Sequence, residues 1–258
     1  MLAGQAVRIR DGVDRAHQSW FRPANRFPNR VFGSIETGVG TENAAVIPQA
    51  LLAIPTAKAA GLASALRISR QRERWQADLY GLAVAARGRV YADAEELDHD
   101  DLELDAVDQL YGHVGLRRYR HVWLAWERNR LLGAAIAWRG PLGFNFSFLE
   151  NRCDLLLDPG LEAVKAEAVV RALLRAASET YADLPLGAIP VVARCDDVHD
   201  VVAAGAEPVR NYTQSIWLQP GFEAMYAHMA RFYERIERAS IRLDLAGPSE
   251  LASAVTRS

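Results

Sequence analysis

The chain has 258 residues, half of them hydrophobic and 24% charged, a composition typical of a globular protein that buries a substantial core. Its formal charge of −2 provides no general attraction to nucleic acids or acidic membranes. Its two cysteines, Cys153 and Cys195, lack a CxxC partner or a histidine cluster, so we expect neither a metal site nor a disulfide framework. There is no signal-peptide pattern, and prolines and a lysine interrupt the apolar stretch Ala44–Leu66, which predicts a cytoplasmic protein without membrane contact.

Charge is unevenly distributed along the chain. Residues 1–92 carry 13 basic and 6 acidic side chains, residues 93–108 carry 9 acidic and no basic ones, and the remainder is balanced at 17 and 17. The acidic run therefore predicts a boundary between an N-terminal region (1–92), a candidate degenerate partner half, and an α/β domain (93–219). Residues 220–258 form a third part, a helix and a tail. Arginine far outnumbers lysine, which is typical of a GC-rich bacterial genome.

The N-terminal region has weak patterns. Residues 20–30 have the composition of loops, and Val31–Val39 is predicted to be a strand that ends at Gly38 and Gly40. Thr56–Gln76 is predicted to be a helix, and a short hairpin is expected from Leu82–Ala86 and Arg89–Ala92.

The second half, Tyr119–Leu218, predicts an alternating α/β unit. Strands are expected at Tyr119–Glu127 and Leu131–Trp138, joined by a tight turn at Arg128-Asn129. The later predicted elements are strands at Phe144–Leu149, Cys153–Leu157, Ala188–Arg194 and Val209–Leu218, and helices at Gly160–Tyr181 and Asp196–Ala204.

The longest helical pattern is Gly160–Tyr181. Asp158 is expected to cap it, with Pro159 in its first turn. One face is apolar, from Ala166 to Tyr181 at spacings of three and four, and Glu167 and Arg171 are placed for an i,i+4 pair on the other. A last helix, Phe222–Leu243, carries an aromatic and methionine stripe, which predicts either packing on the sheet or a homodimer surface.

The order of elements and the hairpin Val122–Trp138 resemble the GNAT-type acyl-CoA N-acyltransferases. The segment Val201–Arg210 is similar to the one that follows the second conserved helix of that superfamily. The resemblance implies a mixed, mostly antiparallel sheet flanked by helices, to which this chain adds an N-terminal region and a C-terminal helix. It covers about 100 of the 258 residues.

The phosphate-binding loop of that superfamily is missing. In place of its R/Q-x-x-G-x-G/A pattern, the chain has Leu155–Ala163, with one glycine, a proline and two carboxylates, Asp158 and Glu162. Carboxylates repel the phosphates that helix N-termini otherwise attract.

Two hypotheses remain open. In the first, the chain transfers an acyl group from acyl-CoA, its co-substrate, to an amine. The resemblance then implies that Glu150 or Asp154 takes a proton and Tyr212 returns one. The acyl-CoA would be bound by Leu155, Leu156, Leu157 and Gly160. In the second, the chain is a non-catalytic relative that binds a small ligand or a partner protein.

Other signals are weaker. The acidic run lacks the spacing of a calcium loop, and its most economical interpretation is a solvated segment before a helix. Arg67, Arg70, Arg72 and Arg74 beside Trp75 are the pattern of a nucleic-acid surface, but Glu73 interrupts them and no matching fold signature follows, so nucleic acid is not an expected partner.

Overall fold

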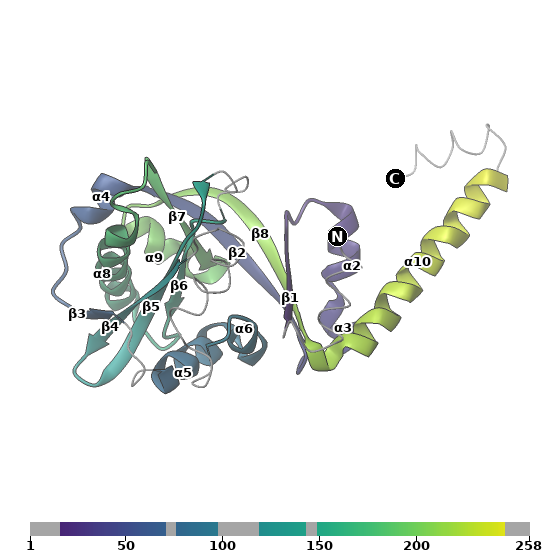
Figure 1. Ribbon diagram of the computed structural model, residues 1–258, viewed down its shortest axis with the longest axis horizontal. Helices are drawn as coiled ribbons and strands as arrows, with labels where there is room; N and C mark the ends of the chain where they lie inside the picture. The colour runs from purple at the N-terminus through teal and green to yellow at the C-terminus, as the bar shows by residue number, and fades with distance from the viewer. Residues whose placement is uncertain (1–15, 71–75, 98–118, 143–148, 246–258) are drawn as a thin grey trace.

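The structure is a computed structural model that describes residues 16–70, 76–97, 119–142 and 149–245. Its centre is an eight-stranded sheet in the order β1-β8-β2-β7-β6-β5-β4-β3 (Figure 1). The strands are β1 (Ala16–Phe21), β2 (Ala44–Pro55), β3 (Arg67–Arg70), β4 (Tyr119–Glu127), β5 (Arg130–Arg139), β6 (Cys153–Leu157), β7 (Ala188–Arg194) and β8 (Glu207–Leu218). The α-helices are α2 (Arg26–Phe32), α3 (Ile35–Val39), α4 (Thr56–Ala60), α5 (Gln76–Arg87), α6 (Arg89–Ala94), α8 (Ala163–Tyr181), α9 (Val198–Ala203) and α10 (Phe222–Leu245).

The sheet is mixed and mostly antiparallel, as expected. Among the described strands, β6 and β7 form the parallel pair and every other neighbouring pair is antiparallel. The predicted hairpin is confirmed, because β4 and β5 meet at a two-residue turn in which Arg128 has a φ of 54°. Gly133 on β5 allows close packing, since a Cβ there would lie 2.8 Å from Val169 Cγ1 on α8.

Helices α4, α8 and α9 cover one face of the sheet. The predicted apolar face of α8 is buried there, and the predicted Glu167–Arg171 ion pair is present at 2.7 Å. The start of α8 was predicted wrongly, because the helix begins at Ala163 rather than at Gly160. Asp158 does not cap it, since its carboxylate closes a turn of its own by accepting the Gly160 N–H at 2.9 Å.

Helices α5 and α6 cover the opposite face. The predicted hairpin at Leu82–Ala86 and Arg89–Ala92 is therefore wrong. Leu79, Leu82, Ala83 and Ala86 are all buried, and their spacing of three and four is helical. The chain turns between the two helices at Gly88, whose φ is +89°.

The N-terminal region differs most from expectation. The predicted strand Val31–Val39 consists of the two short helices α2 and α3, and the predicted helix Thr56–Gln76 stops at Ala60, after which β3 pairs with β4. The apolar stretch that begins at Ala44 is the long strand β2, which lies between β7 and β8. Strands β1 to β3 thus belong to the same sheet as the later strands.

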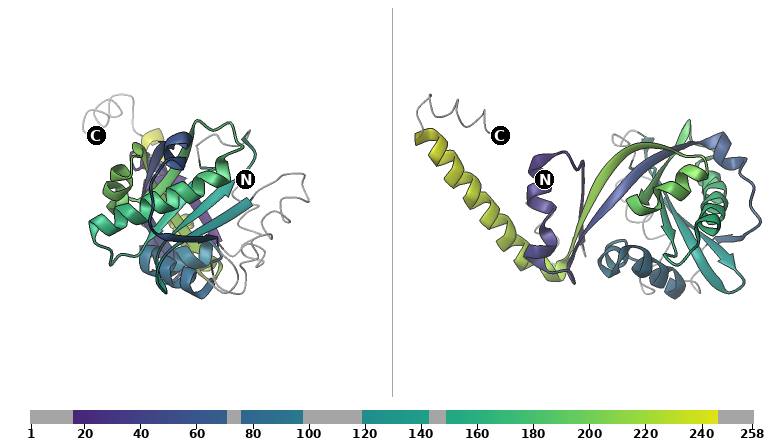
Figure 2. Two further views of the ribbon diagram at one scale, coloured as in Figure 1. Left: turned by 90° about the vertical axis from the view of Figure 1, so that its left-hand side faces the viewer. Right: turned by 180° about the vertical axis from the view of Figure 1, so that it is seen from behind.

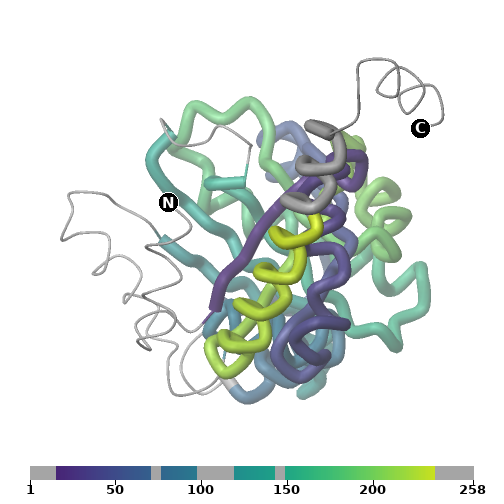
Figure 3. The backbone as a smooth tube through the Cα atoms, turned by 90° about the vertical axis from the view of Figure 1, so that its right-hand side faces the viewer, coloured from purple at the N-terminus to yellow at the C-terminus, as the bar shows by residue number. Residues whose placement is uncertain are grey.

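Strands β2 and β8 are long, and they extend from the main α/β body to a smaller body formed by β1, α2, α3 and α10 (Figures 1 and 2). Helix α10 packs against α3 there (Figures 1 and 3). On α10, Met225 is buried against this small core, whereas Tyr226 and Tyr233 are 68% and 49% exposed. A homodimer through this stripe stays a prediction.

Some expectations fall outside the described residues. They include most of the acidic run, residues 72–75 of the arginine cluster and all but the last residue of the strand Phe144–Leu149. Among the helices that the structure describes, none combines the length and the apolar character needed to cross a bilayer.

Candidate functional site

The parallel strands β6 and β7 separate after only two residue pairs. Cys153 aligns with Val191 and Asp154 with Val192, and beyond these pairs the backbone of Leu155–Leu157 has no partner on β7. In the GNAT resemblance, this split is the place where a pantetheine arm would bind to backbone groups. Backbone carbonyls exposed by such a split need other hydrogen-bond donors when they are buried.

Arg87, the last residue of α5, supplies those donors. Its Nη2 donates to Leu155 O at 2.8 Å and, less closely, to Val192 O at 3.4 Å, so one guanidinium bridges the two strands. The adjoining residue Ala86 accepts a hydrogen bond from Arg194 Nη1 at 2.8 Å, which fixes the end of α5 against β7. The apex of the split is therefore filled by a side chain of the protein itself.

The surroundings of Arg87 satisfy its charge only in part. Its side chain is 7% exposed, and its Cζ lies 4.8 Å from the ring centroid of Tyr91. With the Gln49 amide in the orientation that suits its neighbours, the Gln49 oxygen accepts from Arg87 Nη1 at 2.9 Å. Among the described residues, Arg87 Nε makes no hydrogen bond. The charges of Arg194 and Arg87 oppose the rise that burial causes in the pKa of Asp197, so this carboxylate interacts with the Arg87 guanidinium electrostatically.

A second group of buried charges lies beside Tyr91 on the same face. Arg152 Nε donates to both oxygens of Asp154, at 3.1 and 2.9 Å, and Arg152 Nη2 lies 3.7 Å from Glu95 Oε1. The Arg152 guanidinium also lies over two indole rings, Trp20 at 5.6 Å and Trp138 at 5.3 Å. Opposite charges and aromatic faces together make this burial tolerable.

Two groups in this cluster have shifted acidity. Burial raises the pKa of Glu95, although the Arg152 guanidinium opposes that shift. Burial also raises the pKa of the Tyr91 phenol, whose oxygen makes no hydrogen bond in the described structure. A buried carboxyl with a raised pKa, beside a buried phenol without a hydrogen bond among the described residues, makes this cluster a candidate functional site.

The turn after β6 lies where the superfamily binds phosphate. Arg130 Nη2 donates to Asp158 Oδ2 at 2.5 Å, and Asp158 Oδ1 accepts the Gly160 N–H at 2.9 Å. Partial burial raises the Asp158 pKa, but the Gly160 and Arg130 hydrogen bonds outweigh it and the net shift is downward. An ionised carboxylate of the protein thus takes the N–H group that a phosphate would otherwise use.

Two of the predicted catalytic residues, Asp154 and Tyr212, lie in one neighbourhood of the sheet. Tyr212 packs against Val192, the β7 partner of Asp154, and its ring lies 6.2 Å from that of Trp20, over which the Arg152 guanidinium is placed. Asp154 is 1% exposed and bonded to Arg152 and Trp138, while Tyr212 lies on β8 in a small cluster with Leu51 and accepts from Arg210 Nη1 at 3.3 Å. Glu150 is half-buried in the turn before β6. Asp154 and Tyr212 share no hydrogen bond among the described residues.

The predicted cofactor residues lie in two places, three in strand β6 and Gly160 in the turn that follows it. The side chains of Leu155 and Leu157 pack in the α8 core and that of Leu156 in the α5–α6 core, which leaves only their backbone toward the split. Gly160 is exposed in the turn.

Sequence reasoning missed Arg87, Tyr91 and Glu95. All three come from the segment predicted as a hairpin and an acidic run. The helical spacing of Leu79, Leu82, Ala83 and Ala86 was the available signal, because it places Arg87 at the end of a buried helix. Nothing in the sequence indicated that the guanidinium would enter the sheet.

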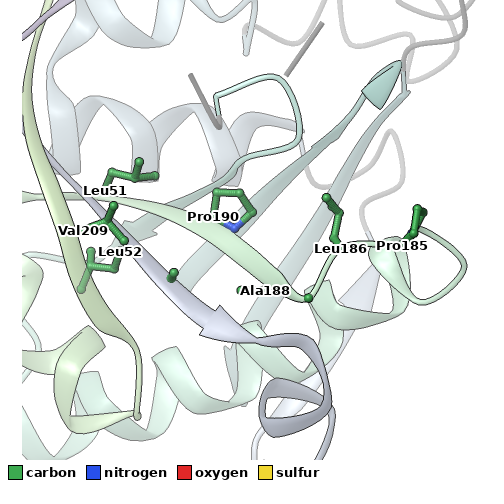
Figure 4. A pocket seen from close by; sticks show the side chains of 9 residues that line it. Leu51, Leu52, Pro185, Leu186, Ala188, Pro190 and Val209 are labelled. Atoms are coloured by element: carbon green, nitrogen blue, oxygen red, sulfur yellow. The ribbon is translucent and has the colours of Figure 1, made fainter. Parts of the chain in front are cut away.

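An apolar pocket of about 290 Å³ lies at the other end of β7 (Figure 4). Leu51, Pro190 and Val209 line it together with the loop at Pro185-Leu186. Val209 is half exposed because a register shift between Leu51 and Leu52 leaves it without a partner on β2. Among the described residues, no three histidine, cysteine, aspartate or glutamate side chains gather as metal ligands would.

No protein-family model matches the chain, and no curated protein matches it. Solved structures do resemble it. A functionally unknown conserved protein from Staphylococcus epidermidis gives a TM-score of 0.46 at 11% identity, over 84% of this chain and 77% of that one. A putative GNAT-family acetyltransferase from Novosphingobium aromaticivorans gives 0.41 at 10%, over 83% and 80%. A GCN5-related N-acetyltransferase from Sphaerobacter thermophilus gives 0.42 at 9%, over 84% of this chain and 66% of that one.

The order of the helices and strands defines the class of fold. The chain has a mixed α/β fold in which β3, α5, α6, β4, β5, β6, α8, β7, α9 and β8 follow in turn, with one parallel pair that splits. The fold is GNAT-like. Its departures from the expected acyl-CoA site lie at Arg87 and at Asp158.

Proposed function

We propose that the chain is a non-catalytic GNAT-like module that binds a small ligand and does not use acyl-CoA. The observation that carries this proposal is the hydrogen bond from Arg87 Nη2 to Leu155 O, which fills the split between β6 and β7. A pantetheine arm would have to displace the buried Arg87 guanidinium. The Leu155 carbonyl would then lose its hydrogen-bond donor and need a new one from the ligand. Losing a buried hydrogen-bond partner costs about 1–3 kcal/mol.

The Asp158 turn supports the proposal independently. Its carboxylate holds the Gly160 N–H and the Arg130 guanidinium, so phosphate would meet a negative charge instead of a free donor. The pantetheine arm of acyl-CoA would therefore meet Arg87 at the split, and its phosphates would meet Asp158 at the turn after β6.

The second candidate is acyl transfer from acyl-CoA to an amine. It is favoured by the split itself, since the unpaired backbone of Leu155–Leu157 is the feature that a pantetheine-binding strand needs. The base in that case is Glu95 in preference to Asp154, because Asp154 is bonded to Arg152 and Trp138.

The test is thermal unfolding of the full chain with acetyl-CoA and with longer acyl-CoAs. A ligand at about 100 times its dissociation constant adds about 2.7 kcal/mol to the free energy of unfolding. We expect no change in Tm with any of them, and no transfer of labelled acetyl groups to a panel of primary amines. A concentration-dependent rise in Tm, or labelled product above the buffer background, would establish the second candidate instead.

A further inference from the structure

The apolar pocket of about 290 Å³ lies at the start of β7 (Figure 4). Of the residues around it, Leu52 and Ile189 pack in the α8 core. Neighbouring side chains in a strand point to opposite faces of the sheet, so Leu51 and Pro190 point away from α8. Helices α5 and α6 cover other parts of that face, but among the described elements neither helix lines the pocket. The pocket is therefore formed by strand surface and by one loop, on the side of the sheet opposite α8.

The lining of the pocket is apolar. Its nine residues are leucines, alanines, prolines, a glycine and a valine, so none of them brings a charged or polar side chain. The two loop carbonyls already have donors, because Leu186 O accepts from Thr56 Oγ1 at 2.9 Å and Gly187 O accepts the Thr56 N–H at 3.2 Å. A charged ligand would lose its hydration here without gaining a partner. The lining therefore favours an uncharged ligand.

Irregular positions in the strands give the pocket its shape. Pro185 and Pro190 line it, and a proline ring fixes the backbone dihedral φ. The register of β2 against β8 shifts between Leu51 and Leu52, which leaves Val209 without a partner on β2. Such bulges redirect side chains and are common next to active sites. Val209 is 50% exposed although it is apolar, and a ligand in the pocket would cover it.

We propose that this pocket binds an uncharged apolar molecule of about the size of two fused rings. An apolar cavity of about 150 Å³ is large enough for one benzene molecule, and the volume here is about 290 Å³. A short hydrocarbon chain shares this chemistry, and the experiment distinguishes the two. The inference rests on the proposed ligand-binding function and names its ligand class.

The test is calorimetric titration of the full chain with 2-naphthol, which presents two rings, and with 1-octanol, which presents a chain. We expect saturable one-to-one binding of 2-naphthol, and tighter binding of 1-octanol would assign the pocket to a chain. The affinity should be the same at low and at high salt, because no charge of the protein takes part. The heat-capacity change of binding should be negative, since apolar surface is buried. The carboxylate analogue 2-naphthoate should bind at least roughly tenfold more weakly.

Two variants test the contacts of the pocket. Val209→Asp places a carboxylate at a half-exposed position of the lining and should weaken binding by roughly tenfold or more. Its matched control is Val202→Asp on α9, because Val202 is 41% exposed and lies outside the lining; this variant should bind like the wild type. Ala188→Leu fills part of the pocket and should also weaken binding. The proposal is overturned if neither probe binds, if 2-naphthoate binds as well as 2-naphthol, or if Val209→Asp and Ala188→Leu both bind like the wild type.

Two further measurements separate this proposal from its alternatives. Acetyl-CoA is titrated in parallel, since its binding would contradict the proposed function, whereas 2-naphthol and 1-octanol decide the role of the pocket. Light scattering gives the mass of the wild type and of Val209→Asp. A lower mass for the variant, with neither probe bound by the wild type, would overturn the proposal and show that a second copy of the chain covers the pocket.

Discussion

The two faces of the sheet differ in kind. The face under α8 is a continuous apolar core that includes Leu155, Leu157, Val170, Leu173 and Val191. The face under α5 and α6 combines an apolar core with buried Arg87, Glu95, Arg152, Asp154 and Gln49. The α8 face stabilises the fold through apolar packing. The α5–α6 face holds charged groups whose burial is tolerated through ion pairs and aromatic contacts, so the stability of this face depends on electrostatics as well as on packing.

The largest expected effect comes from breaking the buried charges. Arg152→Met removes the cation that pairs with Asp154 and lies beside Glu95, and removing one partner of a buried pair costs about 3–5 kcal/mol. Urea unfolding of the variant measures this loss. The control is Arg139→Met, which breaks an exposed pair with Asp183 and should cost at most about 1 kcal/mol. Equal losses for the two variants would contradict the contrast between the faces.

The apolar face should respond through packing alone. Leu173 is fully buried under α8, and Leu173→Ala is expected to cost about 3 kcal/mol without a change in the urea m-value. Val164 is 84% exposed on the same helix, and Val164→Ala should change stability by less than about 0.5 kcal/mol. A loss below about 1 kcal/mol for Leu173→Ala would show that this face is loosely packed.

The contrast also explains what the sequence could predict. Apolar residues recur at helical spacing in α8 and at every second position in β4. Both patterns arise because the element buries one face, and both can therefore be predicted from the sequence. Arg87 and Glu95 lie instead in a segment whose short apolar runs suit a strand as well as a helix. Their roles depend on contacts with β6 and Arg152, about 60 residues away in sequence, and no local pattern records them. The Asp158 turn was predicted as a departure from the superfamily, but its bond to Gly160 was not.

The smallest expected effect is on pH dependence. The raised pKa of Glu95, caused mainly by burial, means that the folded state holds this proton more tightly than the unfolded state does. The resulting stability is complete below the unfolded pKa of 4.5 and is lost as the pH rises through the folded pKa. Glu95→Gln should remove that decline, whose slope is at most about 1.4 kcal/mol per pH unit.

Urea unfolding from pH 4 upward, for the wild type, Glu95→Gln and the exposed control Glu179→Gln, checks this expectation. The control should follow the wild-type curve. Parallel curves for the wild type and Glu95→Gln would mean that Glu95 is solvated or fully paired with Arg152 in the folded protein.

The most direct test of the central claim is a calorimetric titration of the full wild-type chain with acetyl-CoA. Because Arg87 holds the split and Asp158 holds the turn, we predict no binding tighter than about 1 mM, which corresponds to about −4.1 kcal/mol. Saturable one-to-one binding in the micromolar range would contradict the account. It would show that Arg87 leaves the split when the pantetheine arm arrives.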